Sequence, residues 1–103
     1  MLKSKLTHER AEAIAISGLT WLAANHDELE RFLSLSGLSP GELRGLASDH
    51  GFQAGVLAYL ANHEPSLLAF CEMASADGTA IHPSEVLAAR ELLGGTEAYD
   101  RSI

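Results

Sequence analysis

The sequence predicts an all-α protein: a compact, single-domain bundle of about six helices, arranged as two similar three-helix halves. Three observations support this fold class. Apolar residues make up 47% of the 103-residue chain, which is enough to bury a core. Ala and Leu dominate the apolar set, whereas Val, Thr and aromatic residues are few, and this composition favours helix over strand. Finally, no run of residues alternates between apolar and polar as a half-buried strand would.

A repeat in the sequence is the basis for the two halves. Segment 14–35 aligns with segment 52–73 without a gap, and Trp21 falls on Tyr59. The identical pairs are Leu19/Leu57, Leu22/Leu60, Ala23/Ala61, Leu29/Leu67 and Phe32/Phe70. Each copy continues into a helix that starts with a proline. Two explanations stay open: a true duplication, or the chance alignment of two amphipathic helix pairs.

Capping signals place three helices in the first half. Good N-cap residues precede each apolar stripe, and the third start combines a serine, a proline at the first helical position and a glutamate that completes a capping box. The predicted starts are Thr7, Asn25 (with Glu28 as its box partner) and Ser39, and the predicted ends are Ala24, Gly37 and about Ser48. Leu43 and Leu46 are the expected buried side of the third helix.

The second half is expected to hold three more helices and one clear loop. The predicted starts are Asp49, Pro65 and Pro83, and Gly94-Gly95 ends the last helix. The loop spans 75–81 and contains Asp77-Gly78-Thr79. The predicted organisation is an N-terminal lead at 1–6, a helical domain at 7–94 with halves of about 7–48 and 49–94, and a flexible tail at 95–103.

Charge and cysteine content exclude several classes of function. The formal net charge is −7, which disfavours binding to nucleic-acid phosphates and to anionic membrane surfaces. The apolar run 13–24 is too short and too polar to cross a bilayer. The single cysteine, Cys71, rules out an internal disulfide and fits a reducing compartment. We therefore expect an unprocessed, soluble, cytoplasmic protein that binds neither nucleic acid nor membranes.

No residue pattern predicts catalysis, a metal or a cofactor. The histidines lie at or near predicted helix ends, and they form neither an i,i+4 pair nor a zinc-protease motif. His26 and His63 each follow an asparagine at a helix junction; they are either a paired polar site or simple helix-end residues. Cys71 lies in an apolar stretch and is expected to be a core residue rather than a nucleophile. We expect no catalytic residues, no metal ligands and no cofactor-binding residues.

The functional hypotheses are therefore based on the surface that the helices are expected to expose. The first helix has few polar residues, so it is either the central helix or it has a second apolar side for a partner. The leading hypothesis is a non-enzymatic protein-interaction or self-associating domain. The alternative is a carrier for a small apolar ligand, with a pocket between the halves lined by residues such as Trp21, Phe32, Tyr59 and Phe70. The loop at Asp77 to Ile81, where the two copies differ most, is the first expected location of function.

One segment resembles a known family. The run at 32–44, FLSLSGLSPGELR, together with the helix at 52–60 and the LLAF segment at 67–70, is similar to a small alphaproteobacterial family, the domain of unknown function 3572. The resemblance covers about 12–93. The stretch 76–83 is longer here than the short Gly-Leu-x-Pro turn of that family. The resemblance implies a compact helical domain in the bacterial cytoplasm, and it implies no activity, cofactor or binding residue.

Overall fold

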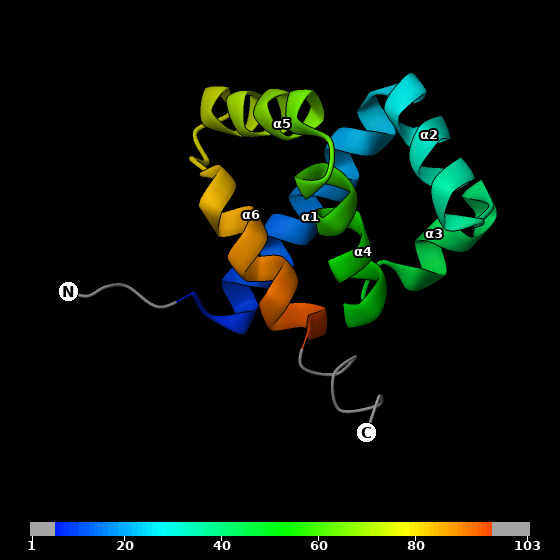
Figure 1. The fold of residues 1–103 in the computed structure, drawn as a ribbon, viewed down its shortest axis with the longest axis horizontal. Helices are drawn as coiled ribbons and strands as arrows, with labels where there is room; N and C mark the ends of the chain where they lie inside the picture. The colour runs from blue at the N-terminus through cyan, green and yellow to red at the C-terminus, as the bar shows by residue number, and fades with distance from the viewer. Residues whose placement is uncertain (1–5, 96–103) are drawn as a thin grey trace.

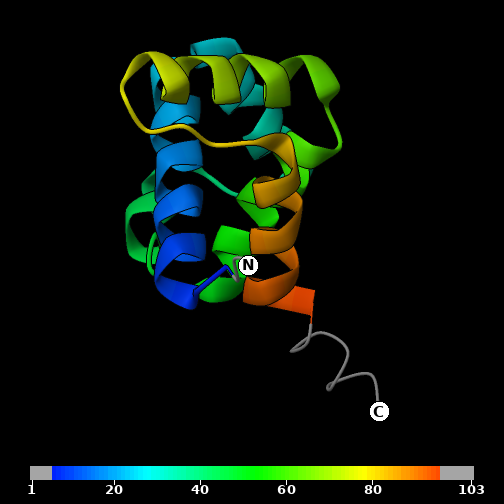
Figure 2. The ribbon, with the colours of Figure 1, turned by 90° about the vertical axis from the view of Figure 1, so that its left-hand side faces the viewer.

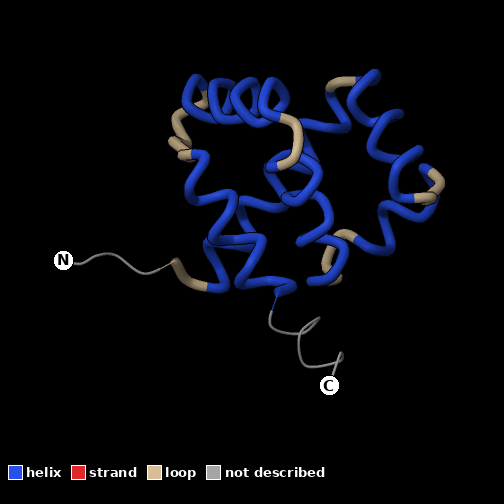
Figure 3. The backbone as a smooth tube through the Cα atoms, in the orientation of Figure 1, coloured by secondary structure: helices blue, strands red, loops and turns tan. Residues whose placement is uncertain are grey.

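A computed structural model describes residues 6–95 and confirms the all-α fold (Figures 1 and 3). No strand occurs in this part of the chain. The helices are α1 (His8–Ala24), α2 (His26–Ser36), α3 (Pro40–Leu46), α4 (His50–Ala61), α5 (Glu64–Ala76) and α6 (Pro83–Arg90), followed by a π-helical turn, η1 (Glu91–Gly95). Over the same residues, no helix is long and apolar enough to cross a membrane. The predicted tail lies outside the described residues, apart from its first residue.

The core forms where α1, α4 and α6 pack together. Figure 2 shows α1 and α6 standing side by side, with α5 lying across one end of both. The largest side chains with almost no solvent contact come from these helices, from η1 and from α5: Ile14, Leu22, Val56, Leu57, Leu60, Phe70, Val86 and Leu93. Burial of aliphatic side chains at about 1.5–3 kcal/mol each is the main stabilising contribution.

Two glycines permit close helix contacts in this core. A Cβ atom on Gly18 of α1 would lie 3.1 Å from Leu60 Cδ1 of α4. A Cβ atom on Gly94 of η1 would lie only 2.6 Å from the Cβ of Ala54. Real Cβ atoms do not approach this closely, so the π-helical turn can pack against α4 only because position 94 has no side chain.

Three contacts join residues that lie 38 positions apart, the offset of the sequence repeat. Glu12 pairs with His50, Glu28 accepts a hydrogen bond from Ser66, and Gly18 lies against Val56. The third helices of the two halves are nevertheless unlike each other. Helix α6 packs in the core and buries Val86 and Ala89, whereas α3 has no buried residue. The structure therefore does not confirm two equivalent halves, and duplication stays a prediction.

The long connection after α5 is fastened to α1. Helix α5 continues to Ala76, so the loop begins later than predicted. Gly78 has a φ of 90°, a left-handed conformation in which glycine is unstrained. Arg10 of α1 donates a hydrogen bond of 3.0 Å to the carbonyl oxygen of Ala80 and pairs with the Glu85 carboxylate at 3.3 Å. The loop that we expected to be the first location of function is thus held by α1, through the Arg10 side chain that also pairs with α6.

The predicted helix starts are confirmed to within one residue, but one predicted capping box is wrong. The Thr7 and Asp49 side chains accept hydrogen bonds from backbone N–H groups in the first turns of α1 and α4, and Ser39 forms its capping box with a glutamate. The predicted box at Asn25 is wrong. Its side-chain amide donates backward to the carbonyl oxygen of Trp21 at 2.7 Å, and its expected partner, Glu28, binds other helices instead.

Candidate functional site

Helices α2 and α3 form an arm that projects from one side of the core (Figure 1). Phe32 is the only buried residue on α2, and α3 has none. Leu43 and Leu46, the predicted buried side of α3, do pack against the core, but both are only partly buried. Apart from Phe32, the arm contacts the core through side chains that are only partly buried.

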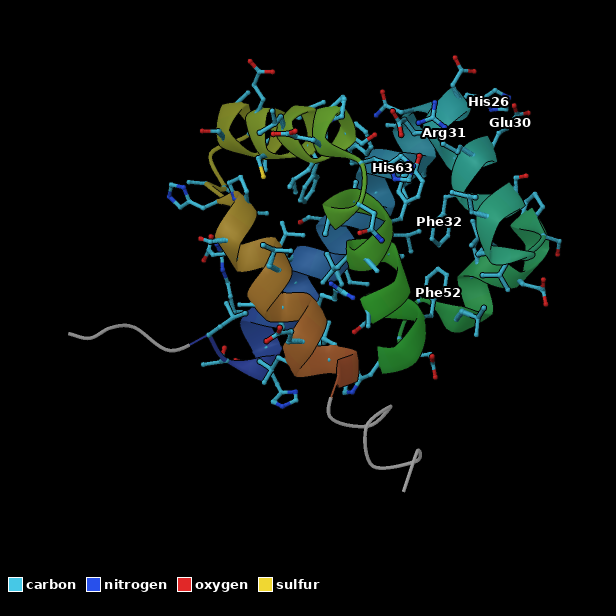
Figure 4. The ribbon with its side chains drawn as sticks, viewed as in Figure 1. His26, Glu30, Arg31, Phe32, Phe52 and His63 are labelled. Carbon is cyan, nitrogen blue, oxygen red and sulfur yellow. The ribbon has the colours of Figure 1, made fainter. Side chains whose placement is uncertain are left out.

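The attachment is an aromatic cluster between α2 and α4. Phe32 meets Phe52 edge-to-face with ring centroids 6.0 Å apart, and it meets Tyr59 in the same way at 5.6 Å. Figure 4 shows Phe32 pointing from α2 toward Phe52 and α4. Edge-to-face pairs contribute about 0.5–1.5 kcal/mol beyond the burial of their area. The cluster attaches the arm to α4, next to partly buried leucines of the arm that also pack against the core.

Beside this cluster lies a groove between α2 and α4 with a volume of about 240 Å³. Its lining is mainly apolar and comprises Phe32, Leu35, Ser36, Gly55, Tyr59, Asn62 and His63. A Cβ atom on Gly55 would meet nothing within 4 Å, so the absence of a side chain there leaves the groove open. Leu35 is 65% exposed, the highest value among the exposed large apolar side chains of the described residues. This groove is the candidate functional site.

A polar network holds α2, α4 and α5 together behind the groove. Tyr59 Oη donates to Glu28 Oε1 at 2.7 Å, and Ser66 Oγ donates to the same oxygen at 2.8 Å. Burial acts to raise the pKa of Glu28, but the two hydrogen bonds and the positive charge of Arg31 together hold this pKa below its usual value. Burial and the neighbouring carboxylate raise the pKa of Tyr59. Glu28 is therefore an ionised acceptor, and Tyr59 is a neutral donor.

His63 closes one end of the groove. Its ring lies against the ring of Tyr59, with centroids 4.5 Å apart, and its Nδ1 is 2.9 Å from the Tyr59 carbonyl oxygen. His26, the other histidine of the predicted pair, has a side chain that is 79% exposed and lies 3.2 Å from the Glu30 carboxylate. Figure 4 labels both histidines and Glu30. Each histidine thus has its own local partner, and these contacts do not join them into one polar site.

A second, wider groove lies beside the loop after α5. It has a volume of about 600 Å³ and is lined by Leu68, Cys71, Glu72, Ser75, Ala80, Ile81, His82 and Pro83. Cys71 is 9% exposed, and burial, followed by the negative charge of Glu85, raises the pKa of its thiol. A protonated, covered thiol is a poor nucleophile. The expectation that Cys71 is a core residue is confirmed.

The aromatic residues proposed to line a carrier pocket fall into two separate groups. Phe32 and Tyr59 border the groove, whereas Trp21 and Phe70 pack edge-to-face against each other and line neither groove. All four rings are buried. Across residues 6–95, no group of three or more histidine, cysteine or acidic side chains could hold a metal ion.

Sequence reasoning missed two features of the site. Glu28 was expected to serve its own helix, but it binds Tyr59 and Ser66. Gly55 was not considered, because a glycine inside an apolar helix gives no local sign of what its bare backbone faces. Glu28 and Ser66 occupy equivalent positions of the repeat, but nothing in the sequence distinguishes them from polar residues that face solvent.

The chain belongs to the family described as "Protein of unknown function (DUF3572)", whose model matches residues 8–96. The match spans every helix of the structure, and it confirms the family suggested by the FLSLSGLSPGELR segment. No curated protein and no solved structure matches the chain.

Proposed function

We propose that this DUF3572 protein is a non-enzymatic protein-interaction domain that binds a helix of another protein in the groove between α2 and α4. The observation that carries the proposal is Leu35, which is 65% exposed at the rim of an apolar groove with an open glycine position. Large exposed apolar side chains beside an apolar depression are typical of protein contact sites. The single free cysteine supports action in the cytoplasm.

The size of the groove favours a helix over a small ligand. Pockets that bind small molecules usually enclose about 300–1,000 Å³ and cover most of the ligand. The groove has about 240 Å³ and is open to solvent, which suits one or two leucine-sized side chains presented by a partner. Recognition of this kind, in which an amphipathic helix lays apolar anchors into a surface groove, is common among soluble proteins. The apolar-ligand carrier is therefore the weaker candidate.

The test fills the groove without disturbing the fold. Leucine at position 55 has room for its first side-chain atom, and replacing glycine inside a helix favours folding by up to about 1 kcal/mol. Gly45→Leu is the matched control, because Gly45 lies on α3, away from the groove lining, and its Cβ would also meet nothing within 4 Å. The wild type and both variants serve as baits for affinity capture, and each captured protein is then purified and titrated against all three.

The expected result is a partner that binds the wild type and Gly45→Leu with equal affinity and binds Gly55→Leu at least about tenfold more weakly. Light scattering of the isolated protein shows whether a second copy occupies the groove instead. The proposal is overturned when all three proteins retain the same set of partners, whether or not that set is empty. It is also overturned when Gly55→Leu dissociates a homodimer that the wild type forms.

A further inference from the structure

The bend between α1 and α2 consists of a single residue, Asn25. Its side-chain amide donates backward to the carbonyl oxygen of Trp21, and none of the described side chains caps the start of α2. The first backbone N–H groups of α2 therefore lack an acceptor within their own helix. In one continuous helix over residues 8–36, these groups would donate to carbonyl oxygens in the last turn of α1. The bend thus leaves backbone hydrogen bonds unformed that a straight helix would contain.

The side of α1 that faces the core continues into α2 without a break in phase. The core-facing positions on the two helices include Gly18, Leu22, Leu29 and Phe32. Counted along one helix, positions 18, 22, 25, 29 and 32 follow one another at intervals of four and three residues. This spacing is that of a single apolar side of one helix, with Asn25 as its polar member. The sequence therefore suits a straight helix as well as the bent pair.

From these two features we infer that two copies of the chain form a dimer by exchanging α1. In this dimer α1 and α2 of each copy form one straight helix, and α1 packs in the core of the other copy. The exchanged helix fits because it is identical to the helix it replaces. A single bend, at Asn25, joins α1 to the rest of the described fold, so only this bend has to open. Exchange of identical elements is a known route to dimers, and short hinges favour it.

Charged contacts of α1 become contacts between the two copies. Arg10 of α1 lies 3.3 Å from Glu85 of α6, and Glu12 of α1 pairs with His50 of α4. Each exchanged α1 meets the same charged partners on the other copy. The net charge of −7 on each chain opposes association at longer range, so added salt should favour the exchanged dimer. Helices α2 and α4 of one copy stay together, so the inference does not depend on the proposed function of their groove.

The first experiment reverses the charges of one contact. Arg10→Glu places two carboxylates against each other within one copy, and Glu85→Arg places two guanidinium groups there. The two variants are mixed, unfolded together in denaturant and refolded, and the dimers are counted by native mass spectrometry. In the exchanged heterodimer, both α1 helices meet the opposite charge. Heterodimers should therefore outnumber all homodimers at least about fivefold, whereas random pairing gives equal numbers.

The matched control is a mixture of Arg44→Glu with Glu30→Arg. These variants have the same net charges as the first two, so the general repulsion between chains is the same. Both positions are exposed and lie on α2 and α3, which are not exchanged. Heterodimers and homodimers should then be nearly equal in number.

The second experiment changes the hinge and follows the dimer by light scattering at several protein concentrations. Asn25→Ala removes the hydrogen bond to Trp21 and introduces a better helix former, so the association constant should rise at least about fivefold. Insertion of two glycines after Asn25 lengthens the bend and interrupts the straight helix, so it should lower the association constant. Ser34→Ala, a similar gain in helix propensity at an exposed position of α2, should leave it unchanged.

Three results would overturn the inference. The first is a wild type and an Asn25→Ala variant that are both monomeric at millimolar concentration. The second is an equal number of heterodimers and homodimers in the mixture of Arg10→Glu with Glu85→Arg, which indicates a dimer without exchange. The third is a dimer that neither hinge change affects. Gly55→Leu should leave the exchanged dimer intact, so the result for the groove is obtained separately.

Discussion

Phe32→Ala should release the arm formed by α2 and α3 while the rest of the fold persists. Phe32 is 4% exposed and makes edge-to-face contacts with two other rings. Burial of a phenylalanine contributes about 1.5–3 kcal/mol, and the two ring pairs add about 0.5–1.5 kcal/mol each. The expected loss is therefore about 2.5–6 kcal/mol, a range that includes the usual cost of about 3–5 kcal/mol for a Phe→Ala change in a core.

Hydrogen exchange resolved by residue is the assay. In the wild type, amides of α2 and α3 should exchange through a local opening that needs less free energy than global unfolding, because the arm has one buried residue. In Phe32→Ala the arm amides should lose nearly all of their protection. For amides of α1, α4 and α6, the free energy of exchange should fall by no more than the free energy of arm opening in the wild type. The reason is that the core stays folded when the arm is detached.

One result would refute this reasoning. Suppose that arm and core amides have the same free energy of exchange in the wild type, and that Phe32→Ala lowers both by the same amount. The arm is then part of one cooperative unit with the core. Leu35→Ala provides the matched control on the same helix. Because Leu35 is 65% exposed, this change should alter stability by less than about 0.5 kcal/mol.

Three further predictions concern the core and the polar network. Gly94→Ala should lower the denaturation midpoint, with a loss of about 1–3 kcal/mol from overpacking against α4, whereas Gly45→Ala should not. Tyr59→Phe should cost about 1–2 kcal/mol at neutral pH in chemical denaturation, because it removes a hydrogen bond to Glu28. The stability that the lowered pKa of Glu28 provides is complete above the unfolded value and disappears as pH falls through the folded value, so Tyr59→Phe should show a shallower loss of stability in acid. Cys71 should react slowly with a thiol reagent in the folded protein and rapidly in denaturant, because burial covers it and raises its pKa.

Local sequence patterns were sufficient to predict the positions of the helices but not how the helices pack against one another. Helix starts depend on neighbouring residues, so Thr7, Ser39 and Asp49 could be identified from the sequence. The hydrogen-bond partners of Glu28 could not be identified in this way, because they lie 31 and 38 residues further along the chain. A carboxylate in the first turn of a helix has the same sequence signature whether it faces solvent or another helix.

The same limit explains why the predicted buried side of α3 is only partly buried. The spacing of Leu43 and Leu46 identifies an apolar side of a helix, and the structure does turn both toward the core. Periodicity, however, does not say how closely a helix approaches the core. Helix α3 lies at the end of the arm, where neighbouring residues cover it only in part. The groove could not be predicted from the sequence for a related reason. It forms between α2 and α4, so its lining depends on how these two helices pack.

The packing of the first helix against the last one affects how the protein is made. Arg10 and Glu85 pair across 75 residues of chain, and the apolar side of α1 is covered in part by α6. Ribosomes add roughly 5–20 residues per second, so about 4–15 s pass between the synthesis of these two residues. Throughout that interval α1 has part of its apolar side uncovered. The nascent chain therefore exposes apolar surface of α1 until α6 has been synthesised and packs against it.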